Sequence, residues 1–248
     1  MTTPGVAEID TTPLADCQAC RFRDELLPDA GCRPGDICIR ADSGRQIDRF
    51  LKRHPELAVD YIADPFWERR AIAARYAPVE AVMSLIADPD EVVRRAVAYR
   101  IPPDSLDPLM ADSDREVRIT VADRLPIHKL EAMVADEDYL VRAYVAKRLP
   151  EGRLFRMICD PDDQVRKTVA RRLPTPSLGL MAHDPELQVR QIVAERMDPQ
   201  SLVLMLNDPE WLIRYLAVQR APLEAVIKLA ADPVAEIRDA VLERTRSV

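Results

Sequence analysis

The chain has 248 residues, of which 48% are hydrophobic and 31% charged, and its formal net charge is −7. A chain of this length can bury a core, and its acidity weighs against generic binding to nucleic acid or anionic lipid. The opening residues, MTTPGVAEIDTTPLAD, lack the basic and apolar stretches of a secretory signal, and no apolar run approaches the roughly 20 residues of a membrane span. We therefore expect a cytoplasmic protein without a membrane segment.

Four of the five cysteines lie close together near the start of the chain. They are Cys17, Cys20, Cys32 and Cys38, in the pattern C-x₂-C-x₁₁-C-x₅-C. A reducing cytoplasm disfavours disulfides, so this cluster predicts metal ligands ahead of redox thiols. The C-x₂-C pair can turn both sulfurs toward one metal centre, but the second pair is wider than in most zinc sites and differs from the bacterial ferredoxin run. Spacing alone leaves zinc and iron–sulfur open.

The cysteines define a predicted module at residues 1–39. This segment has few apolar residues for a core of its own, so metal ligation would supply much of its folding energy. The remainder, residues 40–248, is predicted to form a helical repeat domain. Residues 40–63 fit a degenerate first repeat, 64–231 form seven full units of 24 residues, and 232–248 form a partial eighth.

Each unit opens on an aspartate, which proline follows in five of the seven full units and in the partial eighth, so we expect the aspartate to be an N-cap and the helix to begin there. Apolar residues then recur at helical spacing, as in Val93, Val97 and Ile101. The next proline, such as Pro102, ends the helix. About nine residues remain for a second element, a length that suits a 3₁₀-helix, and no segment alternates like a strand. The prediction is an all-α solenoid.

Arginine recurs in two columns of the repeat, represented by Arg166 and Arg172. These columns could form basic ladders for phosphates or for an acidic partner. Alternatively, the first column lays its aliphatic stems on the core and pairs with the repeat aspartates. We favour the second interpretation because an aspartate accompanies every arginine of that column.

The repeated Asp-Pro, Val-Arg, Val-Ala-x-Arg-Leu-Pro and trailing Leu-x-x-Leu/Met resemble the leucine-rich repeat variant family over roughly three-quarters of the chain. The resemblance implies a right-handed superhelix in which α-helices alternate with 3₁₀-helices. It also implies an N-terminal cysteine segment that holds a [4Fe–4S] cluster. The ligands would then be Cys17, Cys20, Cys32 and Cys38.

The chain has no phosphate-binding glycine loop, nucleophile elbow, zinc-protease motif or dinucleotide fingerprint, so we do not expect an enzyme. We expect a scaffold for protein–protein interaction whose iron–sulfur cluster transfers electrons or senses redox state. One alternative is a zinc-capped structural scaffold without a redox role, and a less favoured one is nucleic-acid binding through the arginines. Trp67, Tyr139 and Trp211 are candidates to face a partner. Cys159 is expected to be a small, partly buried repeat residue.

Overall fold

A computed structural model describes residues 12–246. They fall into two compact units, one that ends at Arg124 and one that begins at Leu125. The first unit contains α1 (Gly44–Arg53), η1 (Pro55–Tyr61), α2 (Trp67–Tyr76), α3 (Val79–Val82), η2 (Met83–Leu85), α4 (Glu91–Arg100), η3 (Pro103–Ser105), η4 (Asp107–Leu109) and α5 (Arg115–Arg124), where η denotes a 3₁₀-helix. The second contains η5 (Ile127–Met133), α6 (Tyr139–Arg148), η6 (Glu151–Met157), α7 (Asp163–Arg172), η7 (Thr175–Met181), α8 (Leu187–Arg196), η8 (Ser201–Met205), α9 (Trp211–Arg220), α10 (Leu223–Val226), η9 (Ile227–Leu229) and α11 (Ala235–Arg246).

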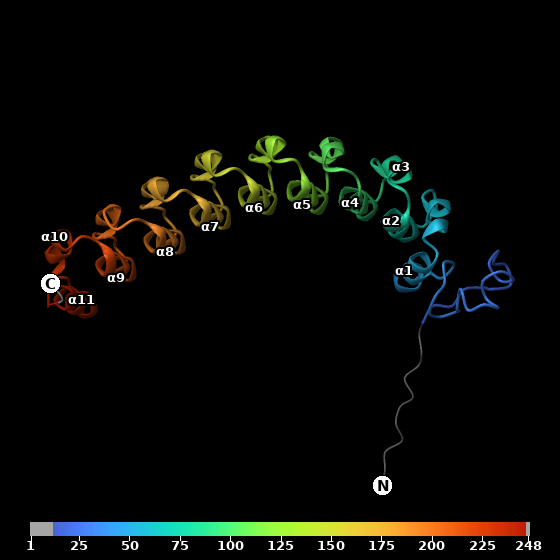
Figure 1. Cartoon of the computed structure of the whole chain (residues 1–248), viewed down its shortest axis with the longest axis horizontal. Coiled ribbons are helices and arrows are strands. Elements are labelled where there is room, and N and C mark those ends of the chain that lie inside the picture. Colours follow the sequence, from blue (N-terminus) through green and yellow to red (C-terminus); the bar gives the residue numbers. More distant parts are fainter. Residues whose placement is uncertain (1–11, 247–248) are drawn as a thin grey trace, which may run out of the picture. The chain divides into compact units, whose positions relative to one another are not determined.

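Each unit is built from two layers. Successive longer α-helices lie side by side in one layer, and the short helices that follow them form the second (Figure 1). The described residues contain no strand and a single isolated bridge between Arg33 and Ile37. The predicted all-α alternation of α- and 3₁₀-helices is confirmed.

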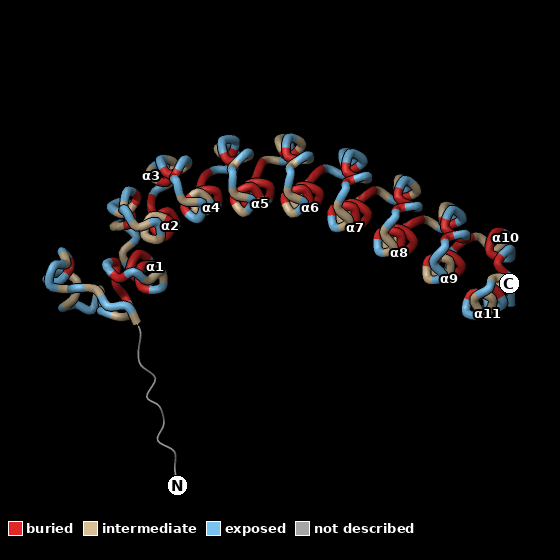
Figure 2. Tube along the Cα trace, turned by 180° about the vertical axis from the view of Figure 1, so that it is seen from behind, coloured by how far each residue is buried: buried red, intermediate tan, exposed pale blue. Residues whose placement is uncertain are grey.

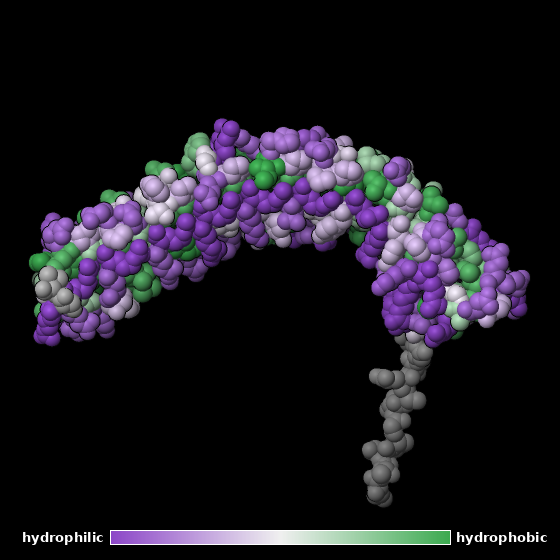
Figure 3. Space-filling model, viewed as in Figure 1, coloured by the Kyte–Doolittle hydropathy of each residue, from purple (hydrophilic) through white to green (hydrophobic). Residues whose placement is uncertain are grey.

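The core of each unit lies between its two layers, where the predicted apolar columns are fully buried. Val93, Val97 and Ile101 have no exposed surface, and neither has Leu106 of the following short segment. Figure 2 shows buried residues on the sides of the helices that face each other within a unit. Small alanines such as Ala98, also fully buried, allow the next α-helix to pack closely. Figure 3 shows that hydrophilic residues cover most of the drawn face, with hydrophobic patches between them.

The prolines end the α-helices as predicted. Ile101, which precedes Pro102, leaves the α region with a ψ of 156°, and Leu173, before Pro174, has a ψ of 137°. Both residues adopt the extended conformation that a following proline imposes.

The predicted helix starts were wrong by two residues, since the N-cap is Asp90 where Asp88 was expected. The α-helix of the repeat that opens at Asp88 begins at Glu91, and its N-cap is Asp90, whose side chain accepts a hydrogen bond from the N–H of Val92. Asp88 instead accepts from the N–H of Asp90 at 2.9 Å and closes a turn in front of the helix. The opening aspartate does not cap the helix because its carboxylate is also used by the preceding repeat.

That second use is an ion pair with the first arginine column. Arg70 donates from Nε and Nη2 to the two carboxylate oxygens of Asp88, at 2.7 and 2.8 Å. The same bidentate pair occurs as Arg94–Asp112 in the first unit, and as Arg142–Asp160, Arg166–Asp184, Arg190–Asp208 and Arg214–Asp232 in the second. The favoured interpretation of this column is confirmed for these pairs, which link one repeat to the next.

The local electrostatics of these pairs follow from burial and hydrogen bonding. Burial by itself raises the pKa of Asp88, but hydrogen bonds from Arg70 and from the N–H of Asp90 outweigh it, and the pKa lies below its ordinary value. The hydrogen bond to Asp88 raises the pKa of Arg70. Both groups are therefore charged in the folded chain at neutral pH.

The second arginine column binds backbone carbonyls at the end of the preceding α-helix. Arg100 donates to the carbonyl oxygens of Ala74 and Ala77 at 3.2 and 3.1 Å, and Arg172 donates to those of Ala146 and Leu149 at 2.7 and 2.8 Å. A cation at this place satisfies helix carbonyls that have no partner within the helix. The sequence interpretation did not foresee this role.

Candidate metal centre

The first cysteine pair lies in a tight turn. The N–H of Cys20 donates to the carbonyl oxygen of Cys17 at 3.3 Å, and the N–H of Arg23 donates to that of Cys20 at 3.1 Å. These two bonds bend the chain after each cysteine. The geometry agrees with the expectation that a C-x₂-C pair can present two sulfurs to one centre.

The second pair flanks a miniature antiparallel hairpin. Arg33 and Ile37 exchange two backbone hydrogen bonds of 2.8 and 2.9 Å, and Gly35 between them has a φ of 80°, which glycine adopts without strain. Cys32 and Cys38 are the residues just outside this bridged pair. Residues opposite each other in an antiparallel pair point to the same face, so the five-residue spacing brings these two side chains together.

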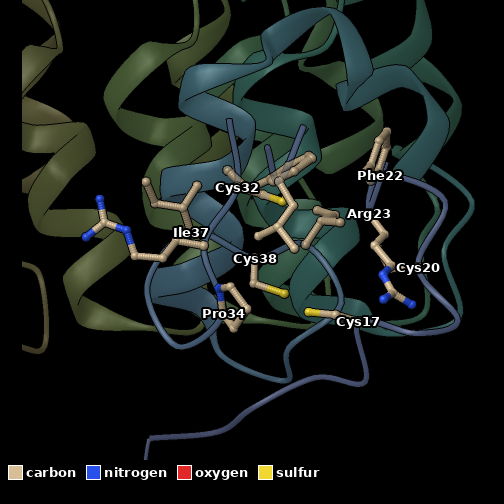
Figure 4. A pocket seen from close by; sticks show the side chains of 12 residues that line it. Cys17, Cys20, Phe22, Arg23, Cys32, Pro34, Ile37 and Cys38 are labelled. Carbon is tan, nitrogen blue, oxygen red and sulfur yellow. The ribbon is translucent and has the colours of Figure 1, made fainter. Parts of the chain in front are cut away.

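All four predicted cysteines line one pocket, together with Phe22, Arg23, Leu27, Arg33, Pro34, Ile37, Ile39 and Phe50. Figure 4 shows the sulfurs of Cys17 and Cys38 pointing toward one another in this pocket. The donor atoms of the lining side chains that could bind a metal are therefore all sulfur, and six of the other side chains form an apolar wall. Such a donor set suits iron–sulfur clusters, zinc or copper(I).

The thiols influence each other across the pocket. Burial raises the pKa of Cys32, and the other three cysteines raise it further. Burial is also the largest cause that raises the pKa of Cys17, followed by Cys38 and Cys20. Among the described residues, no three His, Cys, Asp or Glu side chains converge closely enough to bind a single metal ion together. A cubane cluster does not require such convergence, because each thiolate binds a different iron atom.

The cysteine segment is fastened to the first helices of the repeat region. The N–H of Cys38 donates to the carbonyl oxygen of Gln46 in α1 at 3.2 Å. His54 Nε2 is hydrogen-bonded to the carbonyl oxygen of Gly31, next to Cys32, at 2.9 Å. The ring of Phe50 lies between those of Phe22 and His54, with centroid distances of 5.3 and 5.0 Å. These contacts hold the cysteine loops against α1.

A salt bridge fixes the segment on its other side. Arg21 donates to Asp60 of η1 at 2.6 Å, and its guanidinium lies over the rings of Phe22 and Tyr61. Arg23, two residues later, lines the pocket, is exposed, and makes no ion pair with a carboxylate of the described residues. The sequence interpretation singled out none of these supporting residues, because the main contacts, Arg21 with Asp60, Phe22 with Phe50 and His54 with Gly31, join positions that are 39, 28 and 23 residues apart.

Cys159 is far from this site in the chain and belongs to the second unit. The expectation that it is partly buried was wrong, since it is exposed. Its column lies in the turn before the repeat aspartate, where Ala87, Ala111 and His183 are exposed as well. The side chain there points away from the core, whatever its size.

Comparison with known proteins gives two family matches. Residues 13–60 match the family described as LRV protein FeS4 cluster, and residues 163–186 match the leucine rich repeat variant. The first match includes all four cysteines of the pocket together with α1 and most of η1.

Two individual proteins are also similar. A solved structure described as a leucine-rich repeat variant with a novel repetitive protein structural motif is 60% identical, with a TM-score of 0.87, and the match covers 94% of this chain and 100% of that one. A Rhodobacter capsulatus protein described as an uncharacterized 27.7 kDa protein in the nifB 3′ region is 40% identical over 76 residues. That alignment spans 30% of this chain and 31% of the relative.

Proposed function

Because the chain belongs to the leucine-rich repeat variant family and carries its [4Fe–4S] cluster segment, we propose that it is a redox protein whose repeats bind a partner protein. The cluster either transfers an electron to that partner or controls docking through its oxidation state. The observation that carries this proposal is the pocket in which four cysteines and no nitrogen or oxygen ligand face an apolar wall.

The proposed ligands are Cys17, Cys20, Cys32 and Cys38, one for each iron. The cluster supplies reversible one-electron chemistry when bound. The backbone turns at Cys17–Cys20 and at Gly35 orient the sulfurs, and the rings of Phe22 and Phe50 keep water from one side of the pocket. A site in which every iron has a protein ligand leaves no open position for a substrate, which favours electron transfer over catalysis. We accordingly propose no enzymatic activity.

The four thiols must stay reduced to bind iron. This supports a reducing compartment such as the cytoplasm. No helix of the described residues is long and apolar enough to cross a membrane.

The alternatives receive less support. The match to the FeS4 cluster family favours iron–sulfur over a zinc cap. Nucleic-acid binding through the arginine columns has little support, because the first column pairs with buried aspartates and the second donates to helix carbonyls. Exposed aromatic side chains such as Trp67, Tyr139 and Trp211, each 38% to 45% exposed, support a protein partner instead.

The proposal is tested on protein purified without oxygen. We expect about four iron and four sulfide per chain, visible absorption that dithionite bleaches, and an electron paramagnetic resonance signal in the reduced protein. Replacing Cys38 by serine should lower the iron content, whereas Cys159→Ser, the matched control outside the pocket, should leave it unchanged. Colourless protein that contains one zinc, or iron that dithionite cannot reduce, would contradict the redox function.

A further inference from the structure

We propose that a groove between α9 and α11 in the second unit binds a basic peptide segment of the partner. This inference rests on the proposed scaffold function and names the surface that would bind the partner. The groove is lined by Trp211, Leu212 and Tyr215 of α9 and by Glu236, Asp239, Ala240 and Glu243 of α11. It is remote in sequence from the cysteines and uses none of their supporting contacts.

The floor of the groove is aromatic. Trp211 is 45% exposed, and its ring lies edge-on to that of Tyr215, with centroids 6.4 Å apart. An exposed tryptophan beside a tyrosine offers a large, rigid, apolar surface, which is typical of residues that dominate binding energy in interfaces. Their faces also attract guanidinium and ammonium groups.

The rim of the groove is acidic. Glu236 and Asp239 are exposed and form no ion pair within the described chain, and Glu243 lines the same groove one turn further along α11. No lysine or arginine lines it. Carboxylates beside aromatic rings are complementary to arginine and lysine side chains, which can contact both at once. This charge complementarity selects a cationic partner.

The spacing along α11 sets the size of the ligand. Glu236 and Glu243 are seven residues apart, which corresponds to about 10 Å along a helix at 1.5 Å per residue. An extended peptide covers this length with about three residues. The groove therefore fits a short extended segment in which two basic side chains, two residues apart, point to the same side.

An equivalent groove in the first unit has the opposite charge. It lies between α2 and α4 and is lined by Arg75, Arg95, Arg100, Tyr99 and Val92, among others. Tyr99 is 55% exposed, so the aromatic character is retained while the charge is not. The acidity of the α9–α11 groove is thus a property of these particular side chains and not of the repeat, and the α2–α4 groove provides a matched control.

The test measures the binding of a fluorescein-labelled octapeptide, in which arginine alternates with leucine or glycine, to the full chain with its cluster. Fluorescence anisotropy should show saturable binding that weakens as salt is added, and the same peptide with glutamate in place of arginine should not bind. Trp211→Ala, and separately the pair Glu236→Gln and Asp239→Asn, should each weaken binding at least about tenfold. Tyr99→Ala should leave the affinity unchanged.

Circular dichroism checks that each variant is folded as the wild type. Absence of binding, equal binding of both peptides, or an affinity that the α9 and α11 variants leave unchanged would overturn the inference. Cluster absorption and its bleaching by dithionite are recorded on the same samples. A reducible cluster without peptide binding refutes the groove alone, whereas peptide binding by a colourless protein refutes the redox function alone.

Discussion

The arginine–aspartate pairs make a strong prediction about stability, which Arg166→Met tests. Arg166 donates to both carboxylate oxygens of Asp184, at 2.8 and 3.1 Å, and to the carbonyl oxygen of Asp160 at 2.8 Å. The two side chains are only 10% and 4% exposed. Methionine retains the aliphatic stem against the core, so the substitution removes the charge and its hydrogen bonds with little change in packing.

The expected cost follows from what the substitution leaves behind. Removing one partner of a buried ion pair typically costs about 3–5 kcal/mol, because the other charge stays buried without compensation. Asp184 retains one hydrogen bond, from the N–H of Glu186 at 2.9 Å. We therefore expect a loss near the lower limit, about 3 kcal/mol in the free energy of unfolding.

The measurement is urea unfolding followed by far-ultraviolet circular dichroism. Arg171→Met is the matched control, since Arg171 is an exposed arginine of the same helix without an ion pair in the described chain, and it should change stability by less than about 0.5 kcal/mol. Asp184→Asn preserves the turn with Glu186, and the double variant should lose less than the sum of the single losses, by about 1–3 kcal/mol. A loss for Arg166→Met no larger than for Arg171→Met, or strict additivity, would refute the reasoning.

Three further predictions test other contacts. Arg172→Met removes hydrogen bonds to two helix carbonyls and should cost about 1–3 kcal/mol in urea unfolding, and a cost no larger than that of Arg171→Met would contradict this role. Burial by itself raises the pKa of Asp112, but hydrogen bonds from Arg94 and from a backbone N–H outweigh it and lower the pKa. The contribution of Asp112 to stability is therefore complete above the ordinary aspartate pKa of about 3.9 and is lost as the pH falls below that value. Melting temperatures that stay constant down to pH 2 would disagree. Arg21→Gln breaks the bridge to Asp60 and should increase proteolysis of residues 12–42 without altering the repeats, and an unchanged digestion pattern would count against it.

The repeat architecture could be predicted from the sequence because the same physical requirements recur in every 24-residue repeat. Val165, Val169 and Leu173 must all be buried for one α-helix to pack on the next, and Pro174 must end the helix, so the pattern repeats visibly. The helix start could not be predicted in the same way. An Asp-Pro pair matches an N-cap, but Asp160 accepts a bidentate pair from Arg142, 18 residues earlier, and no local pattern reveals that competing use.

At the candidate site, too, features set by residues close in sequence could be predicted, whereas contacts between residues far apart in sequence could not. Cysteine spacing predicted which residues gather, since Cys17 and Cys20 lie in one turn. The C-x₅-C pair is wider than in most zinc sites, yet the bridge between Arg33 and Ile37 makes Cys32 and Cys38 neighbours. The signal available in the sequence was Gly35 itself, because a hairpin of this kind needs a residue with a positive φ midway between the two cysteines, and glycine adopts that angle without strain. The support from His54 and Arg21 depends on tertiary packing and leaves no local pattern.

Together, the two arginine columns explain why every full repeat has the same length of 24 residues. Arg166 donates at once to the carbonyl oxygen of Asp160, which opens its own repeat, and to the carboxylate of Asp184, which opens the next. Arg172 reaches back to Ala146 and Leu149 in the repeat before. Within each compact unit, these side chains therefore connect a repeat both to the repeat before it and to the repeat after it. Insertion of a whole 24-residue repeat would preserve all of these hydrogen bonds. Insertion of a single residue between Arg166 and Asp184 would move a buried carboxylate away from the guanidinium that compensates its charge. The strict register of the chain is therefore a consequence of burying these charges in pairs.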